Sequence, residues 1–78
     1  MLQMPNDGRS AFEVAIYNKE VRAMVKENLS HSYFDDYWAD VQVRDVVARD
    51  EDEARYLISE RFPPEDGFVI QELYQGRF

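Results

Sequence analysis

The second half of the chain, residues 38–74, has a pattern that few folds accommodate. A valine-rich segment, ADVQVRDVVARD, precedes EDEARYLISERF, which is followed by PPEDG and FVIQELY. The valine-rich and last segments have the β-branched and aromatic content of strands, whereas the middle segment spaces its apolar residues as a helix does. Two consecutive prolines end that helix, because proline donates no backbone hydrogen bond and restricts the residue before it. The pattern predicts strand, helix and strand.

The limits of this helix are marked at both ends. Asp50 is a good N-cap residue, and Glu53 occupies the capping-box position three residues later. After the prolines, Asp66 and Gly67 turn the chain into the last strand, 68–74, which begins with three apolar residues and is expected to be buried on both faces there. The apolar stripe of the helix consists of Ala54, Leu57, Ile58 and Phe62.

The valine-rich strand, which starts near residue 39, has two possible phases. Val46 and Ala48 are out of phase with the valines before position 44. A β-bulge near Arg44 or Asp45 brings both groups to one face, because one extra residue swaps the face. Without a bulge, the residues that point inward together are Val41, Val43, Asp45 and Val47.

The first half begins with a segment, residues 11–17, that fits either a helix or a strand. A capping box formed by Ser10 and Glu13 predicts a helix that continues to position 29, but its apolar residues would lie on two opposite faces. Simple alternation in a strand leaves fewer large side chains exposed, so we expect a strand. Its inward residues are Phe12, Val14 and Ile16.

A helix is expected to follow, with Asn18 as its N-cap and an end near Leu29. Residues 30–37 have no regular period and are expected to form a loop or an irregular helical end. The helix has one apolar stripe, formed by Val21, Met24, Val25 and Leu29, and one basic row, formed by Lys19, Arg22 and Lys26.

These elements predict a single small α+β domain over residues 11–78, preceded by a flexible leader, residues 1–10. Its order is β-α-β-α-β, with a three-stranded sheet and two helices packed on one face. The second half resembles the strand–helix–strand halves of ferredoxin-like modules. That resemblance concerns the fold and implies no function.

Composition narrows the function classes. The 78 residues include no cysteine, which excludes disulfides and thiolate metal sites. The net charge of −7 repels nucleic acid and anionic lipid, so neither is an expected partner. No apolar run is long enough to span a membrane, and the N-terminus has no basic region followed by an apolar stretch. We therefore expect a cytoplasmic protein without a cofactor.

The candidate sites are few. His31, Asp35 and Asp36 supply three ligands, an imidazole and two carboxylates, for a divalent metal if their loop folds back, although the ordinary interpretation is a solvated loop. No serine lies in a nucleophile elbow, so we expect no catalytic residues. Four clustered aromatic residues either cover the core or contact a partner, and the basic row is either a solvated helix face or a contact for an anionic partner. The aromatic cluster is Tyr33, Phe34, Tyr37 and Trp38.

The sequence therefore favours a non-enzymatic protein-interaction or self-associating module. A homodimer is a candidate assembly, because an exposed sheet edge pairs readily with a second copy. The first alternative is a metal or small-ligand binding protein that uses the loop of His31, Asp35 and Asp36. The second alternative is an acidic nucleic-acid mimic or inhibitor.

Overall fold

The computed structural model describes residues 8–76 and contains three strands, two α-helices and two short 3₁₀ helices. In chain order they are β1 (Ser10–Asn18), α1 (Lys19–Lys26), η1 (Asp36–Ala39), β2 (Gln42–Ala48), α2 (Glu51–Arg61), η2 (Pro64–Asp66) and β3 (Phe68–Gln75). The predicted order β-α-β-α-β is confirmed, with a strand and not a helix at residues 11–17. Most of the predicted leader lies outside the described residues, and Ser10 already belongs to β1.

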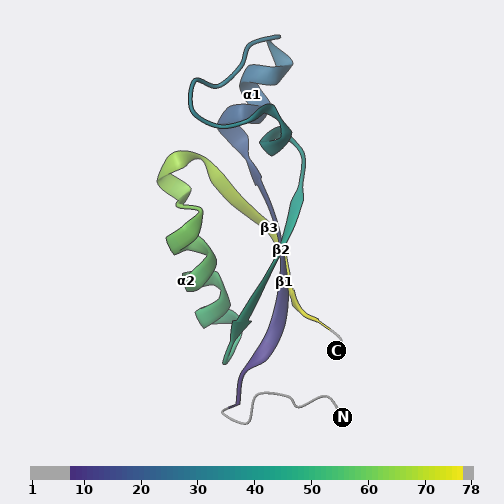
Figure 1. The fold of residues 1–78 in the computed structure, drawn as a ribbon, viewed down its shortest axis with the longest axis vertical. Coiled ribbons are helices and arrows are strands. Elements are labelled where there is room, and N and C mark those ends of the chain that lie inside the picture. Colours follow the sequence, from purple (N-terminus) through teal and green to yellow (C-terminus); the bar gives the residue numbers. More distant parts are fainter. Residues whose placement is uncertain (1–7, 77–78) are drawn as a thin grey trace.

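The three strands form an antiparallel sheet in the order β2-β1-β3. Because β2 and β3 both run opposite to β1, they run in the same direction, with β1 inserted between them. The unit β2-α2-β3 is thus a split strand–helix–strand motif, as in ferredoxin-like modules. Figure 1 shows α2 along one side of the strands and α1 beyond the end of β1. The predicted α+β domain is confirmed.

The core lies between the sheet and the helices. Alternate residues of β1 point toward α2, and Val14 and Ile16 are fully buried there. Val21 of α1 and Ile58 of α2 join the same cluster, so both helices contribute to one core. Full burial of such a side chain stabilises the fold by roughly 1.5–3 kcal/mol. With so few buried residues, each one carries a large share of the stability.

Both predicted phases of β2 are wrong. The pairing of β1 with β2 is continuous, so there is no bulge near Arg44 or Asp45; the irregularity lies in the pairing of β1 with β3. Val43 and Val47 do share a face with Asp45, but that face points outward, and the two valines are 54% and 47% exposed. The residues opposite the inward positions of β1 are Gln42, Arg44, Val46 and Ala48.

The physical reason is the position of Arg44. Its guanidinium carbon lies 5.1 Å from the ring centre of Trp38 and 5.9 Å from that of Phe62. The aliphatic stem of an arginine covers apolar surface while its charged group reaches water. A count of valines therefore selects the wrong face of this strand.

Helix α1 is shorter than predicted. It ends at Lys26, because Asn28 adopts the left-handed conformation, with φ of 59°. The amide of Asn28 donates to the carbonyl of Val25 (3.0 Å), and that of Leu29 donates to the carbonyl of Met24 (2.8 Å). These two bonds form a Schellman motif. Leu29 consequently leaves the predicted apolar stripe and is 55% exposed.

Candidate functional site

A pocket of about 370 Å³ lies where the loop after α1 meets the end of α2 and the start of β3. Its volume is within the roughly 300–1,000 Å³ that ligand pockets occupy. Aromatic and charged side chains dominate its lining, which consists of Tyr33, Phe34, Trp38, Glu60, Arg61, Phe62, Pro63, Asp66 and Phe68.

The floor of this pocket, which we call the aromatic pocket, is a cluster of three rings that contact one another. Trp38 and Phe68 are each 7% exposed and meet edge to face, with ring centres 5.1 Å apart. Phe62 contacts both rings at 5.3 Å. Such tilted and edge-to-face contacts are the preferred aromatic geometries. Trp38 therefore serves the core as well as the pocket floor.

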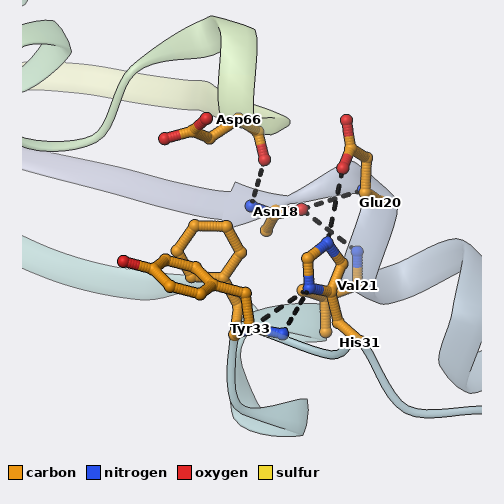
Figure 2. Close-up of polar contacts among 7 residues, drawn as sticks. Asn18, Glu20, Val21, His31, Tyr33 and Asp66 are labelled. Atoms are coloured by element: carbon orange, nitrogen blue, oxygen red, sulfur yellow. Dashed lines mark hydrogen bonds and ion pairs between the residues drawn. The ribbon is translucent and has the colours of Figure 1, made fainter.

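The loop that forms one wall is organised by His31 (Figure 2). Its Nδ1 accepts hydrogen bonds from the backbone amides of Tyr33 (3.0 Å) and Phe34 (3.2 Å). Because Nδ1 accepts, the imidazole proton lies on Nε2, which is 3.5 Å from Oε1 of Glu20. The imidazole thus ties the loop to α1 and sets the positions of the two aromatic residues.

A second junction, also drawn in Figure 2, fixes the start of β3. Asn18 is fully buried; its Oδ1 caps α1 by accepting from the amides of Glu20 (2.9 Å) and Val21 (3.1 Å). Its Nδ2 donates to the carbonyl of Asp66 at 3.0 Å. Both the oxygen and the nitrogen of this buried side-chain amide therefore have hydrogen-bond partners, as buried polar groups require.

Gly67 completes this junction. It has a φ of +100°, and its carbonyl accepts from the amide of Lys19 at 2.8 Å. A Cβ atom at this position would lie 2.7 Å from Oδ1 of Asn18, which is closer than real Cβ contacts occur. Only glycine fits both the backbone conformation and the space. The predicted turn at Asp66 and Gly67 is confirmed.

The rim of the aromatic pocket combines exposed aromatic surface with charge. Tyr33 is 83% exposed and contacts Phe34 edge to face at 4.8 Å. Glu60 and Asp66 contribute two carboxylates to the lining, against one guanidinium from Arg61. Aromatic faces and carboxylates both favour a cationic group, and aromatic grooves also accept proline.

The predicted partner contacts are separated by the fold. Tyr33, Phe34 and Trp38 line the aromatic pocket, whereas Tyr37 is outside its lining, 51% exposed, and contacts Trp38 with their rings tilted at 48°. In the predicted basic row, the Nε of Arg22 donates to the carbonyl of Ala39 at 2.8 Å, and its guanidinium lies 3.7 Å from the ring centre of Tyr17.

Arg22 is thus a structural residue, while the other two members of the basic row, Lys19 and Lys26, are exposed. The row is not one uniform surface. The two lysines are exposed and can contact an anionic group, whereas the guanidinium of Arg22 is bound to Ala39 and Tyr17.

The predicted metal ligands are not brought together. The Nδ1 of His31 is occupied by two backbone amides, and Oδ2 of Asp36 accepts from the hydroxyl of Ser30 at 3.4 Å. Asp35 precedes η1 and makes no side-chain cap. Within residues 8–76, no group of three or more histidine, cysteine or acidic side chains is placed to hold a metal ion.

Sequence patterns missed part of the pocket. The sequence pattern places Phe62 in the helix stripe, Phe68 in the buried strand and Pro63 at the end of the helix, without joining them in one pocket. The available signal is the aromatic residue on each side of PPEDG, because a tight turn between them brings their rings together.

Comparisons with protein-family models, curated proteins and solved structures returned no match to this chain. No helix in the described residues is long and apolar enough to cross a bilayer.

Proposed function

We propose that this protein is a non-enzymatic interaction module that binds a short segment of a partner protein in the aromatic pocket. The single supporting observation is a pocket with a floor of mutually packed aromatic rings and a strongly exposed tyrosine, Tyr33, at its rim. Tyrosine and tryptophan are favoured interface anchors, because they bring a large contact area at a small cost in side-chain entropy. The predicted cytoplasmic location stays a prediction.

The chemistry of the pocket selects the class of segment. An aromatic-lined groove suits an extended, proline-containing segment, whose backbone is already ordered before binding. The carboxylates of Glu60 and Asp66 and the net charge of −7 favour a neighbouring Arg or Lys on that segment. We therefore propose a proline-containing basic segment as the ligand.

The chain supplies its own reporter for a test. Trp38 is the only tryptophan and lies on the pocket floor, so entry of a peptide changes its fluorescence. Peptides that combine proline with arginine are titrated into the wild type, Tyr33→Ala and a control, Tyr56→Ala. Tyr56 is 61% exposed on α2 and does not line the pocket.

Tyr33→Ala is expected to weaken binding by at least about 10-fold, as loss of an anchor residue does. The control is expected to bind as the wild type does. Equal affinities of the two variants would reject the pocket as the binding site, as would a panel of such peptides that produces no fluorescence change.

Self-association is a second candidate function. It is supported by two free sheet edges, because β2 and β3 each pair with β1 alone. Both edges carry features that discourage pairing: Arg44 and Asp45 lie mid-strand in β2, and β3 has an irregular register against β1. Light scattering after size exclusion tests this candidate, which requires a mass of two chains at micromolar concentration.

A further inference from the structure

The face of the sheet opposite α2 has no covering layer within residues 8–76 (Figure 1). Strand register places on it the outward residues of all three strands. We call this surface the open face and define it by six residues. They are the apolar Val43, Val47 and Tyr74 and the acidic Glu13, Asp45 and Glu72.

The apolar part of the open face is well exposed. Val43, Val47 and Tyr74 are 54%, 47% and 47% exposed, and they belong to the two outer strands. On this side the central strand carries Ala11 and Ala15, with Glu13 between them and Tyr17 at the end near α1. Outer strands of a three-stranded sheet lie about 10 Å apart, which is close to the roughly 10–12 Å diameter of a helix with its side chains. The surface thus has the width to seat one helix along β1.

The acidic part of the open face contains a cross-strand pair of like charges, which destabilises a sheet. Glu13 lies directly opposite Asp45, and like charges in this position repel each other. Glu72 lies opposite Ala15 and is therefore the diagonal neighbour of Glu13. Within β1, β2 and β3, no Lys or Arg shares this face; the guanidinium of Arg22, from α1, lies 3.7 Å from the ring centre of Tyr17 at one end of it. A docked cation would remove the repulsion, which gives a basic partner an electrostatic advantage.

We propose that the open face docks an amphipathic helix of a partner protein, one whose apolar stripe is flanked by Lys and Arg. The charge pattern argues against a second copy on this face. In a two-fold dimer this acidic surface would face the same acidic surface of the partner chain, and like charges across an interface repel each other. The open face is on the opposite side of the sheet from the aromatic pocket, so the two proposals stand independently.

The probe is a synthetic Leu–Lys amphipathic helix of about 18 residues, or ~27 Å, which is close to the length of the strands. A peptide of the same composition in shuffled order keeps the charge but loses the apolar stripe. A Leu–Glu helix keeps the stripe but reverses the charge. Binding is measured at about 0.15 M salt, where long-range attraction between exposed charges is largely screened.

Two matched triple variants separate a docking surface from general attraction to an acidic protein. Each replaces three carboxylates with amides and changes the net charge from −7 to −4. Glu51, Asp52 and Glu65 are exposed and lie on α2 and η2, away from the open face. The test variant is E13Q/D45N/E72Q, and the control variant is E51Q/D52N/E65Q.

We expect the test variant to bind the Leu–Lys helix at least about 10-fold more weakly than the control variant does. A second variant, V43N/V47N, should likewise lose about 10-fold in affinity, whereas Tyr33→Ala should lose none. Peptide-induced NMR shifts should map to the outward residues of β1, β2 and β3.

Three results would overturn the proposal. Equal binding by the two triple variants would reduce the effect to net charge. Equal binding by the shuffled peptide would remove the role of the apolar stripe. A stable dimer in which Val43 and Val47 are protected from solvent would assign the open face to a second copy. A failure of the aromatic-pocket proposal is seen only with Tyr33→Ala, so the two outcomes are distinguishable.

Discussion

The two faces of β1 differ in how completely their groups are satisfied. On the side toward α2, Val14 and Ile16 are fully buried. At the end of the strand, the buried side-chain amide of Asn18 is hydrogen-bonded through both its oxygen and its nitrogen. On the other side, half-exposed valines surround two opposed carboxylates, Glu13 and Asp45. One strand therefore supplies stability through one set of alternate residues and contact surface through the other. Changes of equal size on the two sides should have very different costs.

The largest difference is expected between two aliphatic truncations. Ile16→Ala should lower the free energy of unfolding by about 3–4 kcal/mol, because it removes buried methyl groups and leaves a cavity. Val47→Ala, on the open face, should change it by less than about 0.5 kcal/mol. Urea unfolding followed by Trp38 fluorescence measures both. Similar costs at the two positions would mean that the open face is covered in solution.

The next largest effect concerns two glycines with positive φ. Gly67→Ala should destabilise the protein by about 2–3 kcal/mol, since the new Cβ would collide with Asn18 in a conformation that alanine avoids. Gly8→Ala is the matched control, because φ is +83° there but no atom lies within 4 Å of the new Cβ. It should cost about 1 kcal/mol or less. Equal losses would show that strain alone, and not the contact with Asn18, sets the cost.

A smaller effect is expected at His31. Replacement by alanine removes the acceptor for two backbone amides and should cost about 1 kcal/mol. Asparagine should recover part of this loss, because its side-chain oxygen accepts from the amide two residues on. Nitrogen chemical shifts should place the proton of the wild-type imidazole on Nε2. A proton on Nδ1 would contradict the loop geometry.

The smallest effect is a titration on the open face. The hydroxyl of Tyr74 donates to Oε1 of Glu13 at 2.8 Å, and this bond, with the charges of Glu13 and Glu72, raises the pKa of Tyr74 above its ordinary 10.0. A raised pKa means that the folded state holds the proton more tightly. Its stabilising contribution is present below pH 10 and is lost as the pH rises through the higher value.

Glu13→Gln tests this assignment, because it keeps an acceptor oxygen and removes the charge. The pKa of Tyr74 should fall in this variant, as measured from the NMR shifts of its ring. Tyr56, which is exposed on α2, serves as the internal control in both proteins. An unchanged pKa of Tyr74 would exclude Glu13 as its main cause.

The order of the elements follows from the sequence because its determinants are local. The caps at Asn18 and Asp50 and the turn at Gly67 each depend on residues within a few positions, and all three are confirmed. The end of α1 was also a local event, but it depends on the left-handed conformation of Asn28, which asparagine adopts only sometimes.

The face of β2 and the full pocket depend on contacts between distant segments. Arg44 faces the core only because Trp38 and Phe62 lie beneath its guanidinium. The pocket likewise needs Phe34 and Phe68, 34 positions apart in the sequence, to meet at 5.1 Å. Apolar periodicity gives no distance between such segments. It therefore predicts Tyr33 and Phe34 as partner contacts but not the pocket that they line with residues of α2 and β3.

The central place of β1 in the sheet also governs how the chain acquires its fold during synthesis. Phe12 pairs with Gln75, so the strand that emerges early from the ribosome waits for one made much later. Until β3 arrives, β1 and β2 form a two-stranded ribbon, which is marginal in water. A chain dominated by such distant pairings folds slowly for its size. Nascent protein stalled before residue 68 should therefore remain sensitive to proteases, whereas the full chain should become resistant after its release.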